Sequence, residues 1–321
     1  MTQLMFYRLF DPGALTLTRL GSFNCNSTRR HFRMQFAVTI APTAPANLPF
    51  SYYPFLSAAL YQSLETVQPE FAADLHHGEQ HKDRIKLFGF SPLRCRRMTV
   101  NRGGKGSHLP DNENGDTTRP GLLIEGEATF RLFSPWPELM SAVSEGLLAA
   151  GNLRLAASDF LIKSAIVIPQ PVFQETMFWQ PVREASIVTS WKNRETGAKH
   201  YALPGKPVEG HDCAELIRQN LFHKWLRFTD DTGRPDIAAR WAGLNGATPA
   251  ETKAWATRQD VHVELANPAK ARTRLFHIKN NPVRSWAAPV KVTAPVALQR
   301  LIWSAGLGEM NSMGFGAVEA G

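Results

Sequence analysis

The order of strand-like and helix-like segments constrains the fold of this chain more than any other feature of its sequence. From Met34 onward, the apolar periodicity predicts a strand, a helix, two strands, a helix and a final strand. The strands are predicted at 34–40, 86–92, 126–134 and 152–168, and the helices at 54–66 and after Ser134 and Pro135. In a ferredoxin-like domain, this βαββαβ order places two helices on one face of a four-stranded antiparallel sheet.

The same order is predicted a second time, after a proline-containing boundary at 168–173. Asp212 and Glu215 resemble a capping box before a helix that runs through Trp225. A second helix is predicted at 295–306 and strands at 182–191, 261–267, 273–279 and 313–320, the middle two as a hairpin pair. The sequence therefore predicts an α+β protein with two tandem ferredoxin-like (RRM-like) domains, at 34–170 and 171–321, and a long flexible hairpin loop at 99–121.

The segment before Met34 differs from the rest of the chain in charge. Residues 1–33 hold five arginines and one acidic residue, Asp11, and so carry half of the chain's net charge of +8. The segment lacks the continuous apolar stretch of a signal peptide. We expect either a disordered extension outside the fold or a basic arm that contacts a partner, and the net charge alone does not decide for nucleic acid.

The cysteines and the hydropathy indicate a protein of a reducing compartment, and we expect it to be cytoplasmic. Cys25, Cys95 and Cys213 are scattered without the spacing of metal ligands or of a disulfide framework. No apolar run reaches the roughly 18 residues that a membrane span needs. His211 stands close to Cys213, but no second pair completes a four-ligand site, so we expect a helix start there.

Four glycines stand close together in GLGEMNSMGFG, residues 306–316, between the last predicted helix and the last strand. Glycine provides positive φ or room for close backbone approach. The loop is therefore either a chain reversal that packs the helix on the strand, or an anion-binding nest of amide groups shaped around a phosphate backbone. A glycine pattern alone cannot decide between the two.

The tandem arrangement, the first helix PFLSAALYQSL, the following KLFGFSPL and the terminal GLGEMNSMGFG together resemble a known family. They are similar to the CRISPR-associated endoribonucleases that cut repeat RNA precursors into guide RNAs, which belong to the RAMP superfamily of RNA-binding proteins. The resemblance spans about residues 34–321. It implies a metal-independent endoribonuclease without cofactor, whose partner is CRISPR repeat RNA (pre-crRNA and crRNA), with effector-complex subunits or a second copy of the chain as further partners.

The resemblance also implies catalytic residues in the first domain. The family combines a His after the first helix, a Tyr on that helix and a Lys at the next strand, which match His76, Tyr61 and Lys86 here. His77 and His81 leave the identity of the functional histidine open. Without the resemblance, Tyr61 would be a core residue, the histidines a solvated turn and Lys86 a charge on an edge strand.

Phosphate contacts are expected at two basic groups and at the glycine loop. The predicted RNA-binding residues are Arg94, Arg96, Arg97, Lys270, Arg272, Arg274, Gly306, Gly308, Gly314 and Gly316. The alternative for the charges is a solvated surface, and for the glycines it is packing. At the level of function, the alternatives are a non-catalytic RAMP-type RNA-binding subunit of a CRISPR effector ribonucleoprotein and, disfavoured by the terminal loop, a general ferredoxin-like RNA-binding protein.

Overall fold

The computed structural model describes residues 34–70, 72–73, 86–101, 120–230, 233–278 and 281–321. Three predicted features lie outside these residues: the basic segment 1–33, the histidines His76, His77 and His81, and most of the loop 99–121. No helix in the described part of the chain combines the length and the apolar character needed to cross a bilayer.

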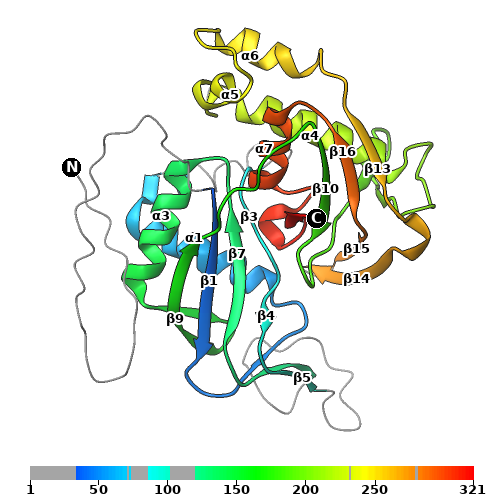
Figure 1. Cartoon of the computed structure of the whole chain (residues 1–321). Helices are drawn as coiled ribbons and strands as arrows, with labels where there is room; N and C mark the ends of the chain where they lie inside the picture. Colours follow the sequence, from blue (N-terminus) through cyan, green and yellow to red (C-terminus); the bar gives the residue numbers. More distant parts are fainter. Residues whose placement is uncertain (1–33, 71, 74–85, 102–119, 231–232, 279–280) are drawn as a thin grey trace.

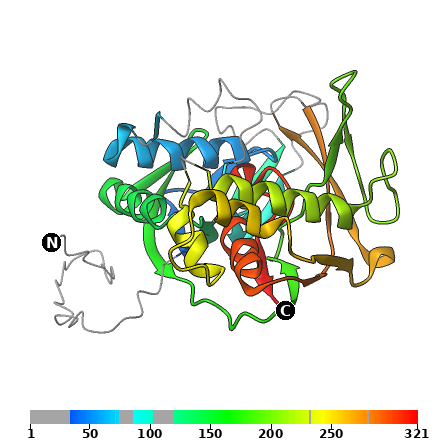
Figure 2. The same ribbon diagram turned by 90° about the horizontal axis from the view of Figure 1, so that it is seen from above.

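The first sheet has the ferredoxin-like strand order. Its strands and helices follow each other as β1 (Gln35–Pro42), α1 (Tyr53–Val67), β3 (Gly89–Phe90), β7 (Ala128–Phe133), α3 (Pro137–Ala150) and β9 (Ser158–Val167). The strands pair antiparallel in the order β3-β7-β1-β9. Both helices lie side by side on one face of this sheet (Figures 1 and 2). The βαββαβ order predicted for this half of the chain is confirmed.

The second sheet repeats this order. Its elements are β10 (Thr176–Pro181), α4 (Cys213–Phe228), β13 (His262–Leu265), β16 (Val290–Thr293), α7 (Val296–Ala305) and β17 (Val318–Ala320). The strands pair as β13-β16-β10-β17, which corresponds element by element to β3-β7-β1-β9. The chain thus consists of two tandem ferredoxin-like domains, and the predicted fold class is confirmed.

Short additions decorate both domains. In the first, β4 (Arg94–Cys95) pairs with β7, β8 (Asn152–Leu155) with β9, and β2 (Ala46–Leu48), β6 (Gly121–Ile124) and β5 (Met98–Asn101) form a small sheet. In the second, β11 (Ser190–Lys192) pairs with β12 (Lys199–Tyr201), and β14 (Arg272–Ile278) with β15 (Asn281–Ala287). The helices α5 (Pro235–Trp241) and α6 (Pro249–Ala256), and the 3-10 turns η2 (Pro268–Lys270) and η3 (Asn311–Met313), complete the described elements.

The prediction that 182–191 forms the first strand of the second sheet is wrong, and only its end belongs to a strand, the short β11 outside that sheet. The first strand of the second sheet is β10, which ends at Pro181 and buries Met177 and Trp179. Beyond it, the chain makes isolated bridges from Ile187 to Trp286 and from Val188 to Glu309. The apolar character of 182–191 comes from burial under these segments and not from membership in the sheet.

Two pairings and the bounds of two strands also differ from the prediction. The strands near 261–267 and 273–279 do not pair with each other, because β13 pairs with β16 and β14 with β15. The predicted strand 152–168 is the hairpin of β8 and β9, which turns at Ala156 with φ of +53°. The last strand is confined to β17, since the chain forms η3 and left-handed glycines before it.

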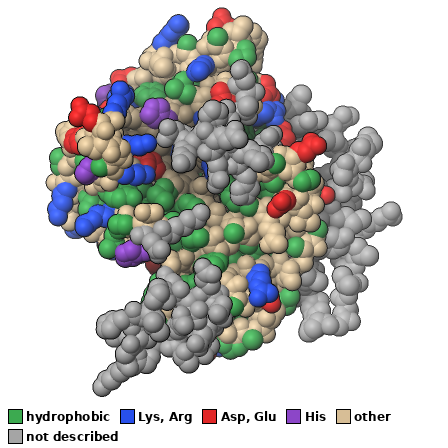
Figure 3. All heavy atoms as spheres, turned by 180° about the vertical axis from the view of Figure 1, so that it is seen from behind, with side chains coloured by type: hydrophobic (Ala, Val, Ile, Leu, Met, Phe, Trp, Pro, Cys, Tyr) green, Lys and Arg blue, Asp and Glu red, His purple; other side chains and the backbone are tan. Residues whose placement is uncertain are grey.

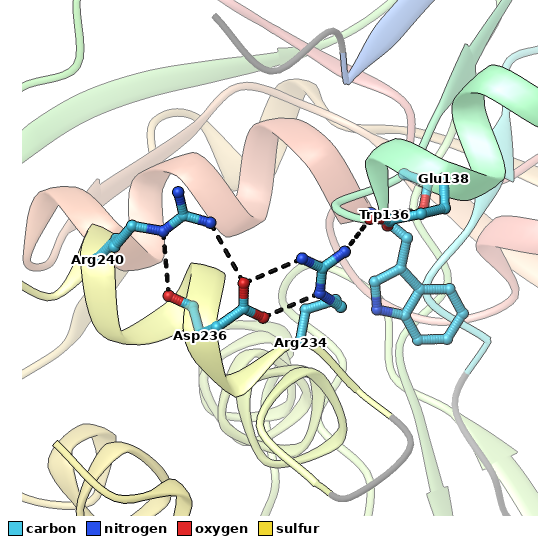
Figure 4. Close-up of polar contacts among 6 residues, drawn as sticks. Trp136, Glu138, Arg234, Asp236 and Arg240 are labelled. Carbon is cyan, nitrogen blue, oxygen red and sulfur yellow. Dashed lines mark hydrogen bonds and ion pairs between the residues drawn. The ribbon is translucent and has the colours of Figure 1, made fainter. Parts of the chain in front are cut away.

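Side-chain contacts join the two domains. The Gln35 side-chain amide on β1 donates to the carbonyl of Trp303 on α7, and Arg131 on β7 forms an ion pair with Glu319 on β17. At the start of α5, the Arg234 guanidinium contacts Glu138 on α3 of the first domain and lies 2.9 Å from the Asp236 carboxylate (Figure 4).

The two helices of the first domain touch through Gly146 on α3. A Cβ atom at this position would lie 2.0 Å from the carbonyl oxygen of Ser63 on α1, far inside any real contact distance. Glycine therefore sets the separation between α1 and α3. Since α1 carries Tyr61, this separation also sets the position of a candidate catalytic residue.

We expect Gly146→Ala to lower the free energy of unfolding by about 1–3 kcal/mol, because the new methyl group must move α1 away from α3. Helix propensity alone predicts the opposite sign, since Ala stabilises a helix interior by about 1 kcal/mol relative to Gly. Urea unfolding measures the difference. Gly126→Ala is the control, because its added Cβ would have no atom nearer than 3.8 Å. Equal stability of the two variants would contradict the close helix contact.

Candidate active site

Tyr61 and Lys86, two of the three predicted catalytic residues, lie in contact. Tyr61 is on α1, is 8% exposed, and packs edge-to-face on Phe88 with 5.5 Å between ring centroids. The Lys86 ammonium lies 5.0 Å from the centroid of the Tyr61 ring, within cation–π range. Tyr61 is thus part of the apolar core and also contacts a half-buried cation. The remaining candidates, His76, His77 and His81, lie between Ala73 and Lys86 in the sequence, outside the described residues.

The chain that follows Lys86 is fixed by close packing. Leu87 is fully buried, and its carbonyl accepts a hydrogen bond of 2.7 Å from the Ser134 hydroxyl at the end of β7. A Cβ on Gly89 would lie 2.5 Å from the Phe133 ring and 2.8 Å from the carbonyl oxygen of Asn311. Glycine at this position therefore lets the glycine loop of the second domain approach β3, three residues from Lys86.

The glycine loop, residues 306–316, is packed between the two domains. On one side, the Ser57 hydroxyl of α1 donates to the carbonyl of Ser312 at 3.0 Å, and a Cβ on Gly314 would lie 2.3 Å from the Tyr53 ring. On the other side, a Cβ on Gly308 would lie 2.4 Å from the carbonyl oxygen of Val188. Both glycines have positive φ, +90° and +65°. The loop can therefore pass between the domains only with glycine at these positions.

Most amide groups of the loop glycines are already engaged inside the protein. The N–H groups of Gly306, Gly314 and Gly316 donate to the carbonyls of Ile302, Asn311 and Ser186. These contacts favour the packing alternative for those three glycines over an anion-binding nest. Contact of the loop with RNA stays a prediction. Gly308→Val would disturb the packing on Val188 and so cannot by itself test RNA contact.

A buried lysine, Lys224, contacts the start of this loop, and the sequence interpretation missed it. It lies on α4, is 1% exposed, and its ammonium donates to the carbonyls of Ala305 (3.2 Å) and Gly306 (2.7 Å) at the end of α7. The last carbonyls of a helix have no partner within the helix and carry partial negative charge. Burial lowers the pKa of Lys224 from its ordinary value of 10.5 to about 7, while the nearby Glu309 carboxylate acts in the opposite direction.

The predicted phosphate-binding cations lie at two separate places. Arg94, Arg96 and Arg97 are at or next to β4 in the first domain. All three are exposed, and none forms an ion pair within the described residues. Lys270 at the end of η2 and Arg272 at the start of β14 are exposed. Arg274 differs, because it forms an ion pair of 3.1 Å with Glu184. In Figure 3, Lys and Arg side chains gather at the left of the view, on the side that carries the hairpins of the second domain.

The hairpin that carries this second group is fastened to the first domain. Phe276 on β14 packs edge-to-face on Tyr53 of α1, with 5.4 Å between centroids, and on Phe315 of the glycine loop, with 5.2 Å. The Tyr53 and Phe315 rings stack at 5.7 Å. This aromatic cluster brings α1, the glycine loop and the basic hairpin together.

The predicted helix start at His211 and Cys213 is confirmed, because Asp212 caps α4 by accepting from the Glu215 amide at 2.8 Å.

Two protein-family models match the chain. The one described as CRISPR-associated protein Cas6, N-terminal, matches residues 47–166, and the one described as CRISPR associated protein Cas6, C-terminal, matches residues 170–320. CRISPR-associated endoribonuclease Cas6 1 of Methanocaldococcus jannaschii is 23% identical to this chain over 273 residues, which cover 84% of the chain and 86% of the relative.

Solved structures show the same fold. A Cas6-related protein from Pyrococcus furiosus superimposes with a TM-score of 0.61 at 15% identity, covering 89% of this chain and 98% of its own. A structure described as CRISPR associated protein Cas6 gives a TM-score of 0.57 at 21% identity, covering 90% and 99%. A Cas6 product complex gives 0.56 at 15% identity, covering 89% and 99%.

We expect the free energy of unfolding of the wild type, minus that of Lys224→Met, to rise with pH between about pH 7 and 10. In this window Lys224 is neutral in the folded state and protonated in the unfolded state. The unfolded state therefore binds more protons, and its free energy relative to the folded state rises with pH, by at most about 1.4 kcal/mol per pH unit for one group. The contribution is complete above about 10.5 and is lost as the pH falls through 7. Urea unfolding of both proteins across this range measures it, and a difference independent of pH would contradict it.

Proposed function

Because the chain belongs to the Cas6 family of CRISPR-associated proteins, we propose that it is a metal-independent endoribonuclease that cuts CRISPR repeat RNA into guide RNAs. The named relative from Methanocaldococcus jannaschii is an endoribonuclease, and its similarity extends over most of both chains. The partner is the repeat RNA itself, as precursor and as product.

The reaction that fits the candidate residues uses the RNA's own 2′-hydroxyl as nucleophile. This oxygen attacks the adjacent phosphorus in line and the 5′-oxygen leaves, which gives a 2′,3′-cyclic phosphate and a 5′-hydroxyl. One proton must leave the nucleophile and one must reach the leaving oxygen, while negative charge grows on the phosphoryl oxygens. A histidine can transfer protons near neutral pH. A lysine can stabilise the growing charge.

In this proposal His76 is the general acid or base, Lys86 stabilises the charge on the phosphoryl group, and Tyr61 positions the nucleophile or shares in proton transfer. The observation that carries it is the contact between Lys86 and Tyr61. The ring fixes the ammonium at the end of the segment that contains His76, and a cation held in advance costs no reorganisation when the phosphate reacts. Because Tyr61 is largely buried, its ring contributes by holding the Lys86 ammonium in place.

The RNA is held mainly by phosphate contacts in this proposal, because the deep major groove of A-form RNA excludes side chains. Arg94, Arg96 and Arg97 are suited to this role, since no acidic residue of the described chain neutralises them. Arg272 and Lys270 extend the cationic surface on the second domain. Arg274 contributes less, because Glu184 already binds its guanidinium.

A non-catalytic RNA-binding subunit of an effector complex is the second candidate function. The tandem ferredoxin-like fold suits both functions, as does the basic surface. The contact between Lys86 and Tyr61 favours the enzyme, because a scaffold has no need for a lysine held on a tyrosine ring. The two candidates differ in a single observable, which is cleavage.

We expect the purified protein to cut its repeat RNA at one position in EDTA, and His76→Ala to reduce the rate by about 10²–10⁴, the usual effect of losing one acid–base group. RNA affinity, measured by fluorescence anisotropy, should stay within a few-fold, because the histidine acts on the proton and not on binding. His77→Ala is the matched control and should cut at the wild-type rate. Loss of cutting in the control alone would move the role to His77, and wild-type protein that binds RNA but never cuts would favour the second candidate.

A further inference from the structure

A cavity of about 670 Å³ opens on the second domain where three segments meet. Tyr201 on β12, Val283 on β15, and Met310 and Met313 of the glycine loop provide an apolar lining, and Lys199 and Arg284 provide positive charge. The volume lies within the roughly 300–1,000 Å³ of small-ligand pockets, which combine an apolar lining with a few polar groups. The cavity plays no part in the reaction described above.

A chain of polar contacts fixes the cationic side of this cavity. The Ser190 hydroxyl donates to the Glu309 carboxylate at 2.9 and 2.8 Å, and the Lys199 ammonium lies 2.8 Å from the same carboxylate. This position places the Lys199 ammonium 5.8 Å from the centroid of the Tyr201 ring. The Tyr201 face is therefore held beside a fixed cation, and Glu309 balances the charge of that cation.

Arg284 supplies charge that nothing in the described chain balances. It is exposed on β15 and takes part in no ion pair among the described residues. Lys199 and Arg284 together exceed the single carboxylate of Glu309 by one positive charge. An anionic ligand is favoured over a cationic or purely apolar one.

Met310, which lines the cavity, has an unusual backbone conformation. Its φ of +58° and ψ of +32° are left-handed, a region that non-glycine residues rarely adopt. The loop uses glycine at four other left-handed positions, yet it keeps methionine at this one. Strained residues gather at binding sites, and the flexible, polarisable thioether adapts to varied apolar surfaces. Met310 thus combines a strained backbone with a side chain in the cavity lining.

We propose that this cavity binds one unpaired nucleotide of the repeat RNA, with the base against Tyr201 and Met310 and a phosphate on Arg284. Single-stranded RNA is recognised by bases stacked on aromatic side chains, and each such base contributes substantially to affinity. The wall formed by Met310 and Met313 belongs to the loop that contacts α1 and β3 on its other side. The elements that carry Tyr61 and Lys86 and the cavity therefore share this loop as a neighbour. This inference rests on the proposed function.

The test replaces, one at a time, each base of the repeat RNA by an abasic site and measures affinity for the wild type and for Tyr201→Ala. In the wild type, we expect one position outside any paired region at which loss of the base weakens binding by about 5- to 100-fold. In Tyr201→Ala, the intact RNA binds more weakly, and loss of the same base has less than a two-fold further effect. Tyr201→Phe keeps the ring and should behave as the wild type.

Met310→Gly provides a second variant that keeps the loop conformation, because glycine adopts positive φ without strain. It should reduce the effect of the same abasic site without lowering the melting temperature. Arg258→Ala, an exposed arginine at the end of α6, is the control and should leave the abasic profile unchanged.

The outcomes separate this inference from the proposed function. If the wild type cuts the repeat but no single base shows the effect, or if Tyr201→Ala leaves it intact, the nucleotide pocket is wrong and the nuclease stands. If the wild type neither binds nor cuts the repeat, both are wrong. If the abasic effect disappears in Tyr201→Ala, is reduced in Met310→Gly and is unchanged in Arg258→Ala, the pocket is established.

Discussion

The arrangement of the two domains depends on how closely the glycine loop approaches its neighbours on both sides. Gly314 faces Tyr53 of the first domain and Gly308 faces the Val188 carbonyl of the second, each at a distance that leaves no space for a Cβ atom. Buried Lys224 holds the start of the loop through the carbonyls of Ala305 and Gly306. Because β3 touches the same loop through Gly89, the position of Lys86 depends on a segment more than two hundred residues away.

The fold could be predicted from the sequence to the extent that local pattern determines it. The helices α1, α3, α4 and α7 each bury one apolar stripe, so their periodicity reveals them. The first strand of the second domain was assigned to the wrong segment, because Ile187 and Val188 look like strand residues. Their burial comes from Trp286 and Glu309, about one hundred residues away, and no local pattern carries that information. For the same reason, the hairpin of β14 and β15 concealed the pairing of β13 with β16.

The residues of the candidate site could also be predicted from the sequence only in part. Tyr61 and Lys86 were selected by resemblance to a family, and the structure places them in contact. Lys224 carried a signal that could have been used, because it follows Leu221 by three residues and precedes Phe228 by four, on the buried stripe of α4. The cavity around Tyr201 carried none, since residues 199–201, 283–284 and 310–313 meet only in the folded chain. The loop glycines pack between the two domains, which is one of the two alternatives that the sequence leaves open, and their contact with RNA stays a prediction.

The central claim is that the RNA supplies its own nucleophile to a phosphate held beside Lys86. The most direct measurement replaces the single ribose before the cleaved phosphate with 2′-deoxyribose and follows cutting of this RNA in EDTA. We expect the substituted RNA to bind with nearly unchanged affinity and not to be cut, while the all-ribose RNA yields a 2′,3′-cyclic phosphate end. Cutting of the deoxy-substituted RNA at the same position and rate would contradict it.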